Sequence, residues 1–128
     1  MALDYGAART GVAVSDATGT LARPLTVVAR AASEAGLRQL AELVAAESPE
    51  RVVVGLPLTL KGERGAQVEE TALFVEALRS VVDVPVESFD ERFTTAIAAA
   101  GPSAQAPEDA RAAAHLLETY LAWASTRG

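Results

Sequence analysis

The sequence predicts an α/β protein in which a mixed β-sheet is flanked by helices. Two observations predict this fold class. Three short apolar segments with strand-like composition precede residue 30, and clusters of turn-forming residues separate them. After residue 30, segments with helical spacing of apolar residues alternate with short β-branched runs, which is typical of parallel β-α-β units. An antiparallel hairpin joined to such units gives a mixed sheet.

The first third of the chain predicts three short, apolar strands. The turn formers of DATGT, at 16–20, favour a hairpin into the third strand. Pro24 belongs at the beginning of that strand or on a sheet edge, because proline cannot donate a ladder hydrogen bond. The predicted strands are Ala2–Tyr5, Gly11–Ser15 and Leu25–Ala29.

The rest of the chain alternates between helices and strands. Ser33 can cap a helix, because its hydroxyl can accept a hydrogen bond from an amide of the first turn. The run RVVVG, at 51–55, is continuous and β-branched, as expected of a strand covered on both faces. The predicted helices occupy 33–48, 66–82, 94–101 and 108–125, and the predicted strands occupy 51–55 and 84–89.

Composition narrows the classes of protein and of site. The chain has 128 residues, half of them apolar, so we expect one domain spanning residues 1–128. It has no cysteine and one histidine, which excludes a thiolate site and a multi-histidine zinc site. A metal ion would therefore bind carboxylate oxygens, as Mg²⁺ and Mn²⁺ do. The net charge of −6 argues weakly against a non-specific nucleic-acid binder, which usually has a basic surface.

The hydropathy pattern indicates where in the cell the protein is expected. No apolar run approaches the roughly 18 residues of a membrane span. No basic segment precedes an apolar one, as it would in a secretory signal. We therefore expect a cytoplasmic protein with no membrane partner.

Acidic residues occur at three element ends, where functional groups of α/β sheets tend to lie. Asp4 lies in or at the end of the first strand, Asp90 and Glu91 follow the last strand, and Asp109 lies in the first turn of the last helix. Each site has an ordinary explanation: an Asx turn before Gly6, a solvated loop, and an acid favoured by the helix dipole. The functional interpretation depends on convergence of all three sites at one end of the sheet.

Asp109 begins the helix face that we expect to pack on the sheet. A carboxylate on such a face is costly unless it is paired or bound to a metal ion. The other residues of this face are Ala112, Ala113, Leu116 and Tyr120, at i+3, i+4, i+7 and i+11.

Four motifs, found in order along nearly the whole chain, resemble one family. They are LDYGAARTGVAVSD, VVVGLPLTLKGERGAQ, FDERFTT and DARAAAHLLETYL. Together they resemble the RuvX/YqgF family, bacterial nucleases with an RNase H-like fold related to the RuvC Holliday junction resolvase. The resemblance implies a five-stranded mixed sheet, with the first three strands antiparallel and helices on its faces. This agrees with the fold class predicted above.

The resemblance implies a set of functional residues. The implied catalytic and metal-binding acids are Asp4, Glu91 and Asp109, with Asp90 as a candidate supporting ligand, and the implied cofactor is Mg²⁺ or Mn²⁺. Basic and hydroxyl side chains are candidates for holding the substrate, although the basic ones can equally be solvated surface charges. The substrate-binding candidates are Arg9, Lys61, Arg92 and Thr95, and the candidate structural loop residues are Gly6, Gly11, Gly55, Pro57 and Gly62.

The chain departs from the family pattern before Asp109. Family members usually have a longer, basic segment there, whereas this chain has no lysine or arginine between Arg92 and Arg111. Fewer phosphate contacts weaken the electrostatic term that dominates nucleic-acid affinity. In the last motif, His115 is interpreted as a helix-surface or packing residue, because no second histidine or cysteine accompanies it.

The leading functional prediction is a metal-dependent endonuclease. The resemblance implies either processing of the 5′ end of pre-16S rRNA or resolution of four-way DNA junctions, and the sequence does not separate these substrates. A resolvase is expected to be a homodimer, because two symmetric cuts need two sites.

Two alternatives remain at this point. One is a nucleotide-binding module related to actin and sugar kinases, which resembles the chain at DYGAARTG but needs two such domains. The other is a non-catalytic nucleic-acid or protein interaction domain, which the acidic balance and the short segment before Asp109 favour.

Overall fold

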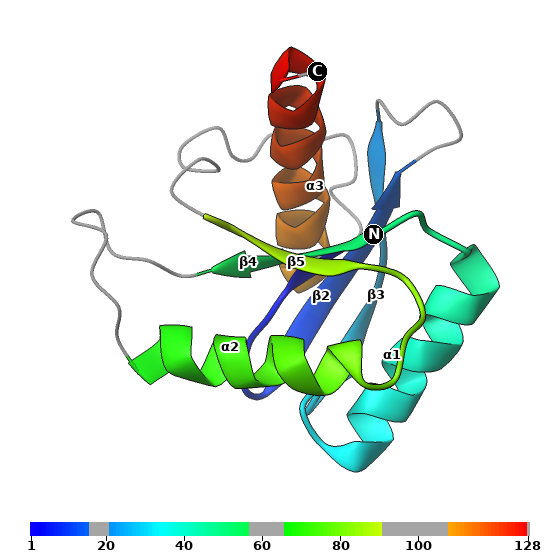
Figure 1. Ribbon diagram of the computed structural model, residues 1–128, viewed down its shortest axis with the longest axis vertical. Helices are drawn as coiled ribbons and strands as arrows, with labels where there is room; N and C mark the ends of the chain where they lie inside the picture. Colours follow the sequence, from blue (N-terminus) through cyan, green and yellow to red (C-terminus); the bar gives the residue numbers. More distant parts are fainter. Residues whose placement is uncertain (16–20, 57–65, 91–107, 128) are drawn as a thin grey trace.

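A computed structural model describes residues 1–15, 21–56, 66–90 and 108–127 of the chain (Figure 1). The described residues form one five-stranded sheet and three helices. The strands are β1 (Ala2–Asp4), β2 (Arg9–Ser15), β3 (Ala22–Ala29), β4 (Val52–Leu56) and β5 (Val86–Asp90). The helices are α1 (Glu34–Glu47), α2 (Ala66–Arg79) and α3 (Glu108–Arg127).

The sheet is mixed, and its strand order is β3-β2-β1-β4-β5. β1 pairs antiparallel with β2, and β2 pairs antiparallel with β3. β1 pairs parallel with β4, and β4 pairs parallel with β5. The predicted fold class is therefore confirmed, with the first three strands antiparallel. Because β1, β4 and β5 are parallel, their carboxyl ends meet at one edge of the sheet.

Helices cover both faces of the sheet (Figure 1). Alternate residues of each strand point to opposite faces. Leu3 and Val54 belong to the core beneath α1 and α2, whereas Ala2 and Val53 belong to the core beneath α3. Val52, Val53 and Val54 are all buried, so the prediction of a strand covered on both faces is confirmed.

The first helix is capped as predicted. The Ser33 hydroxyl accepts a hydrogen bond from the Gly36 amide at 3.1 Å and donates one to the Arg30 carbonyl at 2.7 Å. The helix ends at Ser48, which adopts the left-handed conformation and donates its amide to the Val44 carbonyl. Both ends are set by residues within four positions of the helix terminus, which explains why sequence reasoning found them.

Several element boundaries differ from the prediction. β2 begins at Arg9 rather than Gly11, and β5 begins at Val86 rather than at residue 84. α2 ends at Arg79 rather than near Val82, because the next two amides bond three residues back and the Arg79 guanidinium donates to the Val86 carbonyl. β3 begins at Ala22 rather than Leu25, because pairing with β2 extends to that residue. Pro24 lies on an edge strand, as predicted. The predicted helix at 94–101 lies outside the described residues.

Gly36 supplies a stability prediction. An alanine in place of glycine inside a helix usually stabilises by about 1 kcal/mol. Here an added Cβ would lie against the Arg30 carbonyl oxygen and 2.6 Å from the Cα of Ala31. We therefore expect Gly36→Ala to lower the free energy of unfolding by about 1–3 kcal/mol, measured by urea denaturation. A more stable variant would contradict the close backbone approach.

Candidate active site

The candidate site is centred on Asp4, the last residue of the central strand β1. Asp4 is half-buried. It follows Leu3, whose side chain is 1 % exposed and locks the strand into the core. The next residue, Tyr5, stacks on Phe74 of α2 with ring centroids 4.4 Å apart, and its hydroxyl donates to Glu70. Asp4 is therefore held between two anchored neighbours.

Glycines flank Asp4 on both neighbouring strands. On β2, Gly11 pairs with Asp4. On β4, Gly55 follows Val54, the residue that pairs with Leu3. All three positions lie on the sheet face that α3 covers, because the adjacent residues of each strand belong to the core on the opposite face. No side chain from β2 or β4 therefore stands beside the Asp4 carboxylate at this level.

The loop after Asp4 is closed by a hydroxyl. The Thr10 side chain is fully buried, donates to the Gly6 carbonyl at 3.3 Å and accepts from the Gly6 amide at 3.4 Å. A Cβ on Gly6 would lie 2.6 Å from the Arg9 carbonyl oxygen, so the tight turn requires glycine there. Sequence reasoning missed Thr10, whose only signal is a hydroxyl four residues after a glycine. Arg9 is exposed at the start of β2.

The backbone of Asp90 lies at the same sheet edge as Asp4. Asp90 is the last residue of β5 and pairs with Leu56 of β4. β4 is the one strand between β1 and β5, so two strand spacings, roughly 10 Å, separate the two ends. Sequence reasoning placed both acids at strand ends, and the parallel pairing brings those ends together.

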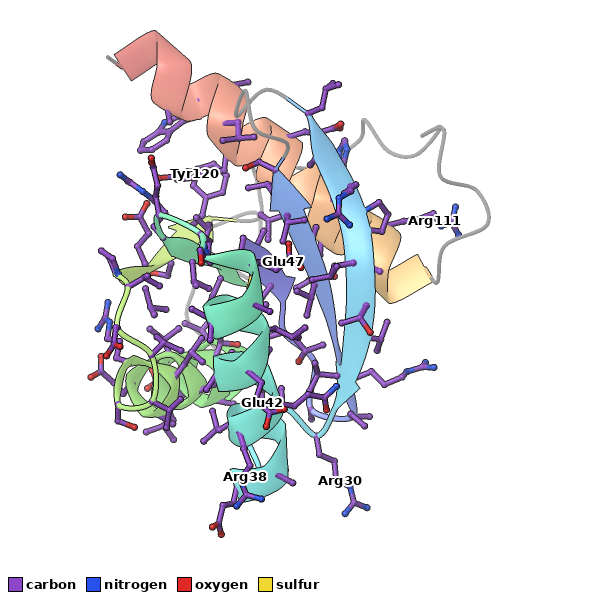
Figure 2. All side chains as sticks on the ribbon, turned by 90° about the vertical axis from the view of Figure 1, so that its right-hand side faces the viewer. Arg30, Arg38, Glu42, Glu47, Arg111 and Tyr120 are labelled. Carbon is purple, nitrogen blue, oxygen red and sulfur yellow. The ribbon has the colours of Figure 1, made fainter. Side chains whose placement is uncertain are left out.

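α3 brings the backbone of Asp109 toward this edge. Tyr120 contacts Arg51, which immediately precedes β4 and lies at the opposite edge of the sheet. Eleven residues separate Tyr120 from Asp109, or roughly 16 Å along a helix. Figure 2 likewise shows Arg111, near the start of α3, far from Tyr120. The first turn of α3 therefore lies toward the carboxyl ends of β1 and β4.

The face of α3 that follows Asp109 is largely the predicted one. Ala113, Leu116 and Tyr120 are buried against the sheet. Ala112 is exposed, so that member of the predicted face was wrong. Around the helix axis, the face that packs on the sheet is centred nearer to Ala113 than to Ala112, so Ala112 points to solvent. His115 is half-buried on the flank of α3, and its Nε2 atom is buried without a hydrogen-bond partner in the structure.

The remaining predicted site residues lie outside the described residues. They are Pro57, Lys61, Gly62, Glu91, Arg92 and Thr95. For Asp90 and Asp109, the structure describes the backbone but not the side chain. Within the described part of the chain, no three acidic or histidine side chains form a group that could hold a metal ion. The donor set that the sequence implies consists of carboxylate oxygens, and Asp4 is the member whose side chain is described. That chemistry fits Mg²⁺ or Mn²⁺.

A hydrogen-bond cluster fixes the middle of α3 on the sheet. The Tyr120 hydroxyl donates to Glu87 of β5 at 2.6 Å and accepts from the Arg51 guanidinium at 3.1 Å. The Tyr120 ring packs edge-on against Phe89, with centroids 5.4 Å apart. Because α3 carries Asp109, this cluster helps to set where that acid lies.

The same cluster predicts alkaline instability. Burial, and then the hydrogen bond to Glu87, raise the pKa of the Tyr120 hydroxyl above 10.0. Burial also raises the pKa of Tyr5. The unfolded chain therefore loses these protons first, so the stability that they contribute is present below pH 10 and is lost above it. When urea denaturation is followed from pH 8.5 to 11, the free energy of unfolding of Tyr120→Phe should decline less steeply than that of the parent. An identical decline would contradict the assignment.

Comparisons with known proteins place the chain among nucleases. A family model described as "RuvX: Holliday junction resolvase" matches residues 1–123. A "Putative pre-16S rRNA nuclease" of Chloroflexus aggregans is 47 % identical over 98 residues, which cover 77 % of this chain and 69 % of that protein. A protein of the same name from Natranaerobius thermophilus is 33 % identical, with 94 % of this chain and 92 % of that protein covered.

The matched stretch is a smaller share of some relatives, which are longer proteins. It spans 64 % of the Chloroflexus aurantiacus protein, which is also 47 % identical. Among solved structures, Thermus thermophilus RuvC superposes with a TM-score of 0.59 at 19 % identity, covering 97 % of this chain and 94 % of RuvC. The same protein in complex with a Holliday junction substrate gives 0.60. At this identity, the likeness concerns the fold. No helix in the described part of the chain has the length and apolar character to cross a membrane.

Proposed function

Since the chain belongs to the RuvX family of Holliday junction resolvases, we propose that it is a metal-dependent endonuclease that hydrolyses phosphodiester bonds. One observation carries this proposal. Asp4 ends the central strand and is flanked by Gly11 and Gly55 on the face that α3 covers. A carboxylate at the end of the central strand, flanked by glycines at the edge where the ends of β4 and β5 meet, suits a site that binds a metal ion and a phosphate group.

The residues proposed to hold Mg²⁺ or Mn²⁺ are Asp4, Glu91 and Asp109, with Asp90 in support. When bound, such ions supply an activated water and stabilisation of the leaving oxygen. The chain itself fixes Asp4 through the anchored neighbours Leu3 and Tyr5, so little reorganisation is needed on binding. Arg9, exposed at the start of β2, is proposed to contact a substrate phosphate.

We favour the 5′ end of pre-16S rRNA as the substrate. The relatives that carry this name are 33–47 % identical to the chain over the regions compared. RuvC, which was solved with a Holliday junction, is 19 % identical. A four-way DNA junction is the second candidate, and only that substrate requires a homodimer with two sites.

A cleavage assay tests the proposed function. The purified chain is incubated with end-labelled precursor 16S RNA, a four-way junction, or a linear duplex of the same sequence, in Mn²⁺, in Mg²⁺ or with EDTA. We expect cleavage of the RNA with either metal ion and none with EDTA. Cleavage of the junction alone would reassign the substrate, and cleavage in EDTA would refute metal dependence.

Two further outcomes address the rival functions. Absence of cleavage in every condition would contradict the nuclease proposal and favour an interaction domain. Heat released on titration with ATP would favour the nucleotide-binding module, so we expect calorimetry to show none.

A further inference from the structure

The turn between β3 and α1 holds an arginine in an uncommon backbone conformation. Arg30 has a φ of 48°, in the left-handed region that side chains other than glycine rarely adopt. Within the described residues, Ser48 is the other non-glycine residue with a positive φ, and it ends a helix, where this conformation is ordinary. Arg30 follows a strand, so helix termination does not account for its conformation.

Backbone hydrogen bonds fix Arg30 against the loop between β1 and β2. Its amide donates to the Ala8 carbonyl at 3.0 Å, and its carbonyl accepts from the amide and the hydroxyl of Ser33 at 2.9 and 2.7 Å. Arg9, the residue after Ala8, pairs with Ala29, the residue before Arg30. The two arginines therefore lie at adjoining positions on neighbouring strands.

Both arginines lie at the sheet edge that carries Asp4. Asp4 pairs with Gly11 of the antiparallel strand β2, so Arg9 lies two residues beyond the level of Asp4. By alternation, Arg9 points to the same face as Gly11, the face of the candidate site. Two strand spacings and about three residues of strand separate the backbones of Arg30 and Asp4, or roughly 14 Å.

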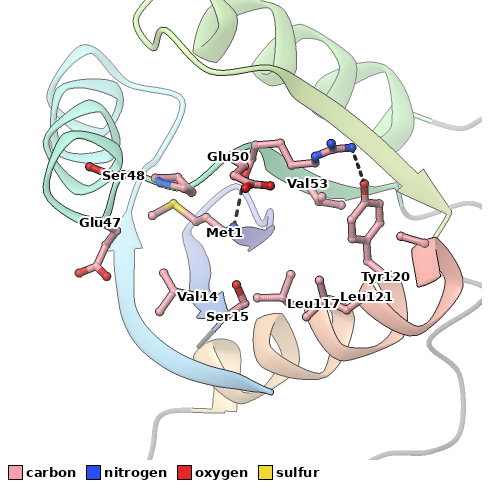
Figure 3. Close-up of a pocket in the computed structure, with 13 residues that line it drawn as sticks. Met1, Val14, Ser15, Glu47, Ser48, Glu50, Val53, Leu117, Tyr120 and Leu121 are labelled. Atoms are coloured by element: carbon pink, nitrogen blue, oxygen red, sulfur yellow. Dashed lines mark hydrogen bonds between the residues drawn. The ribbon is translucent and has the colours of Figure 1, made fainter. Parts of the chain in front are cut away.

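The charge of Arg30 is not neutralised by the described residues. Its side chain is exposed, and Figure 2 shows it projecting from the same end of the molecule as Arg38. Among the residues that the structure describes, no carboxylate lies within ion-pair distance of its guanidinium. Four other arginines have partners: Arg23 with Glu47, Arg38 with Glu34, Arg51 with Tyr120 (Figure 3), and Arg79 with Glu76 and Val86.

We propose that Arg30 binds a backbone phosphate of the nucleic-acid substrate, beyond the scissile phosphate at Asp4. This inference rests on the proposed nuclease function, which places the scissile phosphate there. A guanidinium can donate two parallel hydrogen bonds to one phosphate. The chain has no lysine or arginine between Arg92 and Arg111, so other segments have to supply the charge that binds phosphates. Glycine would relieve the backbone strain at Arg30, and the phosphate contact explains why arginine stands there instead.

Binding measured without cleavage tests the proposal. Fluorescence anisotropy in EDTA gives the Kd of a labelled precursor 16S RNA end and of a four-way junction, from about 50 to 200 mM salt. For Arg30→Gln, we expect Kd at the lowest salt to rise by at least about threefold. The slope of log affinity against log salt should become shallower by about 0.7–0.9, the value of one phosphate contact. Arg30→Lys should keep most of the parental slope, because it keeps the charge.

Two further variants separate binding from overall charge and from folding. Arg23→Gln is the matched control, because Arg23 is exposed at the opposite end of the same strand, and its Kd should stay within about twofold of the parent. Arg30→Gly should weaken binding while its thermal midpoint equals or exceeds that of the parent, because glycine adopts the left-handed conformation without strain. A lower midpoint would assign Arg30 a structural role and overturn the proposal.

The outcomes distinguish a failure of this contact from a failure of the nuclease function. If the parent cleaves RNA but Arg30→Gln has the parental Kd and salt slope, the contact alone is refuted. If the parent cleaves neither substrate and Arg30→Gln still loses affinity and slope, the nuclease function is refuted and the phosphate contact stands. An equal loss for Arg23→Gln would reduce the effect to overall charge and would refute the contact.

Discussion

Replacing Asp4 with asparagine (Asp4→Asn) is expected to abolish phosphodiester cleavage and to leave the fold intact. Asparagine has nearly the same shape but lacks the negative charge needed to hold a divalent cation. Asp4 lies at the end of the central strand, between Gly11 and Gly55, so no side chain from the neighbouring strands replaces it at this level. We expect kcat/KM on the precursor RNA to fall by at least about 10³-fold, which corresponds to about 4 kcal/mol.

Asp83→Asn is the matched control for this substitution. Asp83 is exposed in the turn before β5, so the same chemical change there should leave cleavage within about twofold of the parent. Circular dichroism and the thermal midpoint of both variants establish that each is folded. Parental cleavage by folded Asp4→Asn would refute the assignment of Asp4.

Replacing Phe74 with alanine is expected to have the largest effect on stability. The Phe74 side chain is 1 % exposed in the core beneath α2 and stacks on Tyr5, the residue after Asp4. Its removal leaves a cavity and removes a ring contact, so we expect the free energy of unfolding, measured by urea denaturation, to fall by about 3–5 kcal/mol. A domain is typically stable by about 5–15 kcal/mol, so this is a large fraction of the total.

Leu73→Ala provides the comparison for Phe74→Ala. Leu73 is adjacent on the same helix, but its side chain is 72 % exposed. Leu73→Ala should therefore change the free energy of unfolding by no more than about 0.5 kcal/mol. Similar losses for the two variants would mean that α2 packs by a different face.

Local signals in the sequence were sufficient for most elements. The Ser33 cap, the valines before Gly55 and the apolar spacing of α1 each depend on residues within a few positions of one another. Such patterns are visible without a tertiary structure, because helix capping and strand burial leave periodic signs in the chain. Boundaries were less accurate at α2, where the end depends on a contact from Arg79 to Val86 of β5.

Sequence reasoning likewise identified only part of the candidate site. The motifs identified Asp4 and its family from residue types and order alone. They did not indicate that Gly11 and Gly55 flank Asp4, because that depends on the register of β1 with both neighbouring strands, one of which is distant in the sequence. Nor did they indicate the buried Thr10 hydroxyl or the Tyr120 cluster with Arg51 and Glu87.

By itself, the sequence determined the fold class, the family and the acidic residue at the end of the first strand. The tertiary structure decided the surroundings of that residue and the cluster of Tyr120 with Arg51 and Glu87. The physical reason is that pairing register and side-chain clusters arise from contacts between distant segments, whereas periodicity and motifs are properties of neighbouring residues.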